Sequence, residues 1–454
     1  MEVNGRELLV MKRDITAKLQ EWKSRQDRKP LLLTGLRQCG KTYSIREFGN
    51  ASFQDVAYFN FEEDDAIKTI FEHDFKVHRI LDELGSVIRE KAIEPGKTLV
   101  IFDEIQACPR AITSLKYFCE NMPELHVIAA GSLLGVAMRS EEVSFPVGKV
   151  NRLEMTPMSF SEFVCADGGE KYLKALQKAD LTKEVSALYS EPLKRYLKLY
   201  YIIGGMPEVV KSWVTFHDFS KVTEKQDEIL RDYEDDFGKH APVEQLPRIR
   251  AIWESIPTQI SRENNKFIFS HVKKGCRAKD LEDAMEWLVN AGLIYRLCLT
   301  AKPELPLSGA ADTTYFKVYL SDVGLLCRRS NIHYRTIMDG DEQFIRYKGA
   351  LTENYVLTQL KALLMETYFW RSETDAEVDF ITDFSGMLIL IEVKAADNTK
   401  AKSLHSFCSR YQPQMAIKTS LKNVGDFYDG KTHVWSIPLY LLFRIREYIE
   451  KENI

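Results

Sequence analysis

The sequence predicts a multidomain α/β protein, and three observations support this. The chain has 454 residues, whereas one domain usually takes roughly 150. Its first third alternates short apolar strands with longer amphipathic segments, which is typical of a parallel sheet with crossover helices. A mostly helical stretch and a second group of strands follow. These patterns predict consecutive domains at residues 1–155, 156–242, 243–330 and 331–454.

Composition narrows the class of protein. The chain is 45% hydrophobic and 28% charged, as in soluble globular proteins, and it has no run of about 18 apolar residues that would span a membrane. Its N-terminus lacks an apolar stretch of signal-peptide length. The eight cysteines include no C-x-x-C pair, which predicts neither a zinc ribbon nor a disulfide framework. We therefore expect a cytoplasmic protein without a membrane partner.

Net charge limits the partners further. The formal charge is −4, which excludes a wholly basic nucleic-acid coat but leaves room for a local basic groove.

The first domain is predicted from four apolar segments separated by amphipathic ones. The predicted strands are 31–34, 56–61, 98–102 and 126–130, and the predicted helices are 41–48, 75–91 and 111–121. Residues 156–242 are predicted to be helical, including 191–201 before a Gly-Gly-Met-Pro break, and to form a lid and connector.

The third and fourth domains are predicted from changes of periodicity. Residues 243–330 give two helices (248–260 and 279–290) and then two strands (293–299 and 315–320), an order that resembles a winged helix-turn-helix. Residues 349–365 predict a helix, followed by strands at 368–371, 376–382 and 387–394. The last domain is therefore expected to be another α/β unit.

A phosphate-binding loop follows the first strand. The residues Gly35, Leu36, Arg37, Gln38, Cys39, Gly40, Lys41 and Thr42 match G-x-x-x-x-G-K-[ST] in full, after a strand and before a helix. The loop's backbone N–H groups and the helix start favour phosphates. We expect Lys41 to reach the β and γ phosphates of ATP and Thr42 to coordinate Mg²⁺.

Acidic residues end another apolar strand. Asp103 and Glu104 follow Leu99–Phe102. We expect Asp103 to hold the Mg²⁺ shell and Glu104 to orient or deprotonate the attacking water. Ser132, after a further buried strand, is either a γ-phosphate sensor or a small turn residue.

Transition-state cations are harder to assign. Arg139, Lys149 and Arg152 are candidates, although a lone basic residue is more often a solvated surface group.

Several segments together resemble a known family. TGLRQCGKT, LVIFDEIQACP, AAGSLLG, FPVGKVNRLEMTPMSFSEF, YIIGGMPE and YLSDVGLL are similar to stretches of prokaryotic AAA-superfamily ATPases that carry a C-terminal domain of unknown function. The resemblance covers nearly the whole chain and implies an AAA-like P-loop NTPase fold, ATP hydrolysis and a homo-oligomer. Members commonly have Gly-Arg where this chain has Gly148-Lys149, which weakens an arginine role there.

The last domain contains a second set of polar residues. On a strand, alternate residues share a face, so Glu377 and Asp379 project together, as do Glu392 and Lys394. Adjacent strands would bring Asp379 and Glu392 to one Mg²⁺ or Mn²⁺, with Lys394 near the attacking water and Glu353 on the preceding helix.

This spacing resembles the PD-(D/E)XK nuclease core, although Val378 stands where the motif has proline. The resemblance implies metal-dependent phosphodiester hydrolysis on DNA or RNA. A solvated face of alternating charges is the structural alternative.

Two functions follow. In the first, ATP binding and hydrolysis control a nuclease-like C-terminal domain that acts on nucleic acid. In the second, an ATP-dependent signalling or assembly switch carries an inactive C-terminal binding module. The helix at residues 279–290 has four acids, which would repel phosphates, so we expect it to contact protein rather than DNA.

Overall fold

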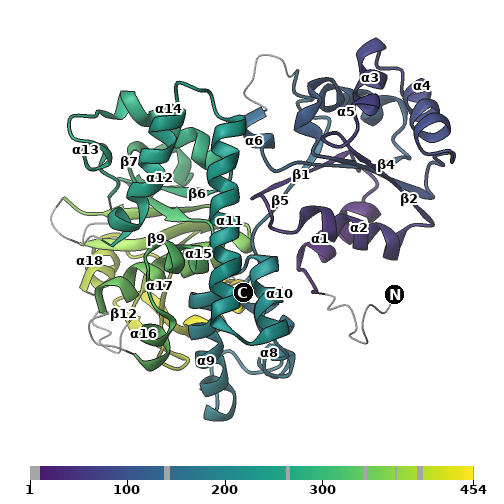
Figure 1. The fold of residues 1–454 in the computed structure, drawn as a ribbon. Coiled ribbons are helices and arrows are strands. Elements are labelled where there is room, and N and C mark those ends of the chain that lie inside the picture. Colours follow the sequence, from purple (N-terminus) through teal and green to yellow (C-terminus); the bar gives the residue numbers. More distant parts are fainter. Residues whose placement is uncertain are drawn as a thin grey trace. The chain divides into compact units, whose positions relative to one another are not determined.

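The protein is described by a computed structural model covering residues 11–137, 144–261, 266–340, 345–373, 376–395 and 402–452. It divides into two compact units. The N-terminal unit contains Lys12–Thr156 and Trp287–Leu293; the C-terminal unit contains chiefly Pro157–Glu286 and Ile294–Ile454. Figure 1 colours the chain from purple to yellow along the sequence.

The N-terminal unit is built on a parallel five-stranded sheet in the order β2-β3-β4-β1-β5. The strands are β1 (Leu31–Gly35), β2 (Asp55–Asn60), β3 (Thr98–Asp103), β4 (His126–Ala130) and β5 (Asn151–Met155). The four strands expected from the sequence are present. The fifth, β5, was missed because Asn151, Arg152 and Glu154 interrupt its apolar pattern and it lies at the sheet edge.

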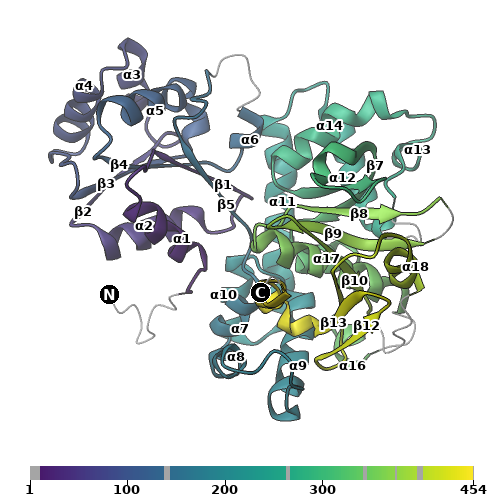
Figure 2. The same cartoon turned by 180° about the vertical axis from the view of Figure 1, so that it is seen from behind.

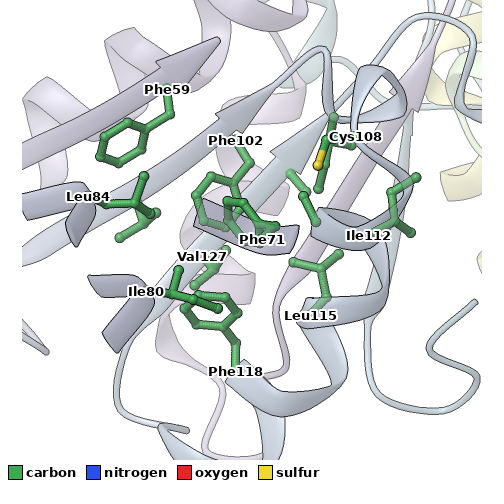
Figure 3. Close-up of a cluster of buried hydrophobic side chains, with 14 of the residues drawn as sticks. Phe59, Phe71, Ile80, Leu84, Phe102, Cys108, Ile112, Leu115, Phe118 and Val127 are labelled. Carbon is green, nitrogen blue, oxygen red and sulfur yellow. The ribbon is translucent and has the colours of Figure 1, made fainter. Parts of the chain in front are cut away.

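Helices cover this sheet. They are α1 (Ile15–Ser24), α2 (Lys41–Ser52), α3 (Asp65–His73), α4 (Val77–Asp82), α5 (Pro109–Asn121) and α6 (Leu134–Ala137). The single helix expected at residues 75–91 is present over a shorter range and in two parts: α4 is followed directly by a π-helical turn, Glu83–Ile88. Figure 3 shows the core between β2, β3, α3 and α5, where Phe59, Phe71, Phe102 and Phe118 meet. This apolar layer fixes the strand ends that carry polar residues.

The C-terminal unit contains one eight-stranded mixed sheet, β12-β13-β11-β10-β9-β8-β6-β7. Its strands are β6 (Ile294–Thr300), β7 (Ala311–Leu320), β8 (Thr367–Arg371), β9 (Glu377–Phe384), β10 (Met387–Val393), β11 (Met415–Ser420), β12 (Gly425–Asp429) and β13 (Thr432–Pro438). Figure 2 shows β8, β9, β10 and β13 one after another across this sheet.

Strand pairing changes the predicted organisation near residue 330. The β6–β7 hairpin was expected in a separate winged-helix-like domain, yet β6 pairs in parallel with β8 through Leu299 and Thr300. The sheet therefore continues across the predicted boundary. The sequence could not show this, because pairing between distant strands leaves no local signal.

The helices of this unit are α7 (Phe160–Ala166), α8 (Glu170–Gln177), α9 (Ala187–Ile203), α10 (Pro207–Phe216), α11 (Phe219–His240), α12 (Leu246–Ile260), α13 (Phe269–Val272), α14 (Ala278–Asn290), α15 (Val323–Arg329), α16 (Tyr334–Asp339), α17 (Ile345–Ala362), α18 (Lys402–Tyr411) and α19 (Ile445–Glu452). Of these, α7–α12, α14 and α17 fall on predicted helical stretches, whereas α13, α15, α16, α18 and α19 were not predicted. None of the helices in the described ranges combines the length and apolarity needed to cross a membrane.

A tight joint connects α9 to α15 and explains why α7–α11 group with the C-terminal sheet rather than with the P-loop unit as a lid. Asp322 accepts hydrogen bonds from the Gly205 N–H at 2.6 Å and the Leu325 N–H at 2.8 Å. A Cβ on Gly204 would stand 2.1 Å from Asp322 Oδ1, and one on Gly324 would stand 2.4 Å from Ile203 O. The segments YIIGGMPE and YLSDVGLL therefore meet in this joint.

Candidate functional site

The P-loop adopts a conformation that only glycine tolerates at two positions. Gly35 and Gly40 have φ angles of +147° and +94°, and a Cβ on Gly35 would lie 2.2 Å from Met155 O. Lys41, the first residue of α2, donates to Gly35 O and Leu36 O at 3.0 Å each. Its ammonium group therefore lies at the mouth of the loop that the sequence predicted for phosphates.

Arg13 supports this loop from outside the motif. Its buried guanidinium donates to Cys39 O and Thr156 O at 2.7 Å each. These bonds connect the loop to the end of β5. Sequence reasoning missed Arg13 because a single arginine far upstream carries no spacing signal.

Thr42 and Asp103 meet, as expected for a shared Mg²⁺ site. The Thr42 hydroxyl donates to Asp103 Oδ2 at 2.7 Å. Tyr58, which the sequence did not single out, donates to the same oxygen at 2.8 Å. Burial and the Asp103 carboxylate raise the pKa of Tyr58, so it remains a neutral donor that orients Asp103.

Hydrogen bonds position Glu104, which the sequence predicted to act on the attacking water. It has a φ of +48°, a left-handed conformation that is uncommon outside glycine and often found at functional sites. Gln106 Nε2 donates to Glu104 Oε2 at 2.5 Å, and the Ser132 hydroxyl donates to it at 3.4 Å. Ser132 reaches Glu104 because β4 lies between β1 and β3. Gln106 was missed, although it lies in the DEIQ segment.

The candidate transition-state cations predicted from the sequence differ in their surroundings. Arg139 lies outside the described residues. Lys149 forms an ion pair with Glu120 at 2.9 Å. The Arg152 guanidinium lies 4.4 Å from the Phe145 ring centroid. Each of the two described cations thus has a partner within its own unit.

The donor set fits ATP with Mg²⁺. Positive-φ glycines leave the loop's backbone open to phosphates, Lys41 supplies a cation, and the Thr42 hydroxyl with the Asp103 carboxylate supplies hard oxygens for Mg²⁺.

A second polar cluster lies in the C-terminal sheet. Lys394 Nζ is 2.6 Å from Glu392 Oε1, so the two side chains project together as predicted. Asp379 on neighbouring β9 accepts a hydrogen bond from the Val393 N–H at 2.7 Å. Asp379 and Glu392 therefore lie at one place on adjacent antiparallel strands.

Strand β7 contributes a lysine that sequence reasoning missed. Lys317 is 1% exposed, and its Nζ lies 2.5 Å from Glu377 Oε1 and 4.0 Å from Glu353 Oε2. Tyr319 donates to Glu353 Oε2 at 2.9 Å. Helix α17 thus brings Glu353 to the cluster as expected. The only local signal for Lys317 was a charge within the apolar strand FKVYL.

The charged groups of this cluster shift one another's pKa values. Burial and the Glu392 and Glu353 carboxylates raise the pKa of Asp379 well above its usual range, against the opposing effect of Lys317 and Lys394. Burial raises the pKa of Glu392, while Lys394 opposes this. Burial lowers the pKa of Lys394, but Glu392 and Asp379 outweigh it and the net shift is upward.

The ligand geometry at this cluster is incomplete. In the described part of the chain, no three His, Cys, Asp or Glu residues are arranged to hold a metal ion. Glu392 is 2% exposed, and its Oε2 has no hydrogen-bond partner. Glu392 Oε2 is therefore buried and available to a ligand. Lys394 pairs with Glu392 Oε1, and Lys317 pairs with Glu377 Oε1.

Three family models match consecutive parts of the chain. An AAA domain matches residues 27–164, a domain of unknown function (DUF8612) matches 194–336, and another (DUF4143) matches 348–440. The first match contains the P-loop, Asp103, Glu104 and Ser132. The match to an AAA domain at residues 27–164 thus supports a P-loop ATPase domain and ATP binding. The other two models carry no described activity.

Two curated relatives match a short part of this chain. Uncharacterized proteins of Mycobacterium bovis and Mycobacterium tuberculosis are each 38% identical over 117 residues. The match covers 25% of this chain and 24% of each relative, so about a quarter of their length is compared.

Solved structures match at low identity. A Walker-type ATPase of Pyrococcus abyssi has a TM-score of 0.45 and 16% identity over 70% of this chain and 96% of its own. The ORC1 protein of Aeropyrum pernix, solved in complex with DNA, has a TM-score of 0.28 and 12% identity over 71% of this chain and 92% of its own.

Proposed function

We propose that the protein hydrolyses ATP and that its nucleotide state controls a metal-dependent, nuclease-like site in the C-terminal unit. ATP hydrolysis is supported chiefly by Glu104, whose carboxylate is oriented by Gln106 and Ser132 and which directly follows Asp103, the partner of Thr42. Glu104 orients or deprotonates the attacking water, and Lys41 stabilises the developing charge on the phosphates.

The proposal for the C-terminal unit rests on charge and burial. Four carboxylates (Glu353, Glu377, Asp379 and Glu392) surround two ammonium groups (Lys317 and Lys394). Glu392 is buried and the other three carboxylates are partly buried. This excess of acid favours either protonation, in line with the raised pKa of Asp379, or a divalent cation. Asp379 and Glu392 would hold Mg²⁺ or Mn²⁺, and Lys394 would stabilise the charge that develops on a phosphodiester.

Chain connectivity supports control of one unit by the other. Helix α14 begins in the C-terminal unit, but its end and the turn before β6 belong to the N-terminal unit. Helix α14 and the turn after it are therefore one of the chain connections between the two units. Both strands of the β6–β7 hairpin belong to the sheet that carries Lys317.

A second candidate is an ATP-dependent assembly switch with an inactive C-terminal module. Lys317 favours it, because a buried ammonium at 2.5 Å from Glu377 supplies positive charge without a metal. A homo-oligomer is compatible with either candidate.

Nicking of supercoiled DNA, measured with Mg²⁺ or Mn²⁺ and with ATP, separates the two. The first candidate predicts nicking by the wild type, loss of nicking in Asp379→Ala and Lys394→Ala with ATPase activity retained, and altered nicking in Glu104→Gln. ATP turnover that does not respond to nucleic acid, with no nicking and no metal binding, would establish the switch instead. RNA of the same sequence tests the second nucleic-acid class.

A further inference from the structure

A cavity of about 630 Å³ lies in the C-terminal unit between α9, α16 and α17. Its apolar lining includes Leu197, Tyr201, Ile337 and Leu439. The volume lies within the range of about 300–1,000 Å³ that ligand pockets usually have. Neither function considered above assigns this cavity a role.

Four cations line the same cavity. Lys194, Arg195 and Lys198 come from adjoining positions of α9, and Lys348 comes from α17. Among the described lining residues Glu191 is the one acid, and it pairs with Lys194 at 2.8 Å. The lining therefore has a positive charge excess, which favours an anionic ligand.

The cavity and the carboxylate–lysine cluster draw residues from the same two chain segments. Thr352 and Ala395 line it, and each is next in the chain to a cluster residue, Glu353 and Lys394. An anion in the cavity would thus be held by the same two segments, α17 and the residues after β10, that carry Glu353 and Lys394.

We propose that this cavity binds one nucleotide unit of a single-stranded nucleic acid next to the reacting phosphate; this rests on the proposed nuclease-like function. The base lies against the apolar lining at Tyr201 and Leu197, and the flanking phosphates contact Arg195 and Lys348. Stacking or apolar contact for bases together with cations for the backbone is the usual basis of sequence-tolerant single-strand binding.

The test is fluorescence anisotropy of a labelled oligothymidylate with the full chain, in the Asp379→Ala background and EDTA, so that no strand is cut. Arg195→Gln with Lys348→Gln should weaken binding at least about 10-fold. The slope of log affinity against log salt should fall by about 1.4, at about 0.7 per phosphate contact in single strands. Lys178→Gln with Lys211→Gln removes the same charge from exposed positions outside the cavity, and should change affinity by less than about twofold.

A charge-conserving pair, Arg195→Lys with Lys348→Arg, should restore binding and shows that the neutral pair lost charge rather than folding. Equal binding by the cavity pair and the control pair overturns the inference. So does displacement of the strand by thymidine monophosphate at equal concentration, because the site would then prefer a free nucleotide. Strand binding that depends on the cavity pair, in a wild-type protein that never nicks, would refute the proposed nuclease function and leave the cavity as a nucleotide-binding site without a reacting phosphate.

Discussion

Gln106 Nε2 donates a 2.5 Å hydrogen bond to Glu104 Oε2, the carboxylate placed beside the Thr42–Asp103 pair. A Cβ on Gly131 would stand 2.0 Å from the Gln106 Oε1 atom, so the small residue after β4 makes room for this amide. The arrangement makes Gln106 a positioning residue for Glu104.

Gln106→Ala is expected to lower kcat for ATP hydrolysis by about 10-fold or more while leaving KM for ATP nearly unchanged, because Glu104 loses its orientation and the P-loop is untouched. Steady-state ATPase assays give both constants. Glu104→Gln should lose about 10²–10⁴-fold in kcat and still bind ATP. Lys116→Ala, an exposed change on α5, is the control. A rise in KM with unchanged kcat would assign Gln106 to nucleotide binding.

Glu392→Gln is expected to abolish Mn²⁺ binding at the C-terminal cluster. The substitution replaces the buried carboxylate, whose Oε2 lacks a hydrogen-bond partner, with a neutral amide. Titration calorimetry without nucleotide on the Asp103→Asn background removes the contribution of the Thr42–Asp103 metal site. Asp383→Asn changes an exposed acid on the same sheet and should leave binding intact. Equal heats for the two variants would exclude a metal at Glu392.

Lys317→Met is expected to destabilise the C-terminal unit by about 3–5 kcal/mol, because removing one member of a buried ion pair leaves carboxylates uncompensated. If the cluster holds a divalent cation, Mg²⁺ or Mn²⁺ should restore much of this loss. Thermal unfolding of the variant with and without each ion provides the measurement. Loss of stability that no divalent ion changes would favour the switch with an inactive module.

Gly324→Ala is expected to destabilise the protein by about 1–3 kcal/mol or to prevent folding, because the new Cβ would stand 2.4 Å from Ile203 O. Gly349→Ala is the matched control, since nothing lies within 4 Å of its Cβ position in α17. That change should be neutral or stabilising by about 0.5–1 kcal/mol. Urea denaturation compares the two. Similar stability in both variants would contradict the tight α9–α15 joint.

Asp322 should make stability pH-dependent. Burial raises its pKa from 3.8 to about 6, so the folded protein retains a proton that the unfolded chain has lost. Stability from this group is therefore full below about pH 4 and falls as pH rises to about 6, by about 3 kcal/mol at most. Asp379 and Glu392 shift in the same direction, so the wild type is compared with Asp322→Asn. Urea midpoints from pH 4 to 7 should fall less steeply in Asp322→Asn. Identical slopes would refute the raised pKa.

The nucleotide site could be predicted nearly complete from the sequence, because its parts are local. Gly35–Thr42 encodes its own loop geometry, and Asp103 and Glu104 follow an apolar run whose β-structure is evident from its residues. Strand order then brought Ser132 to Glu104. Arg13, Tyr58 and Gln106 escaped prediction because a single polar residue does not show which distant backbone or carboxylate it will meet.

In the C-terminal unit, sequence by itself determined which side chains share a face: Asp379 with Glu377, and Glu392 with Lys394, by the two-residue period of a strand. Tertiary structure alone decided that β7 joins the same sheet and places Lys317 among those acids. The physical reason is that strand periodicity is set by the local backbone, whereas pairing between β6 and β8 is set by burial across residues far apart in the chain. The P-loop can thus be identified from the local sequence alone. The balance of charges at the C-terminal carboxylate–lysine cluster arises only on folding.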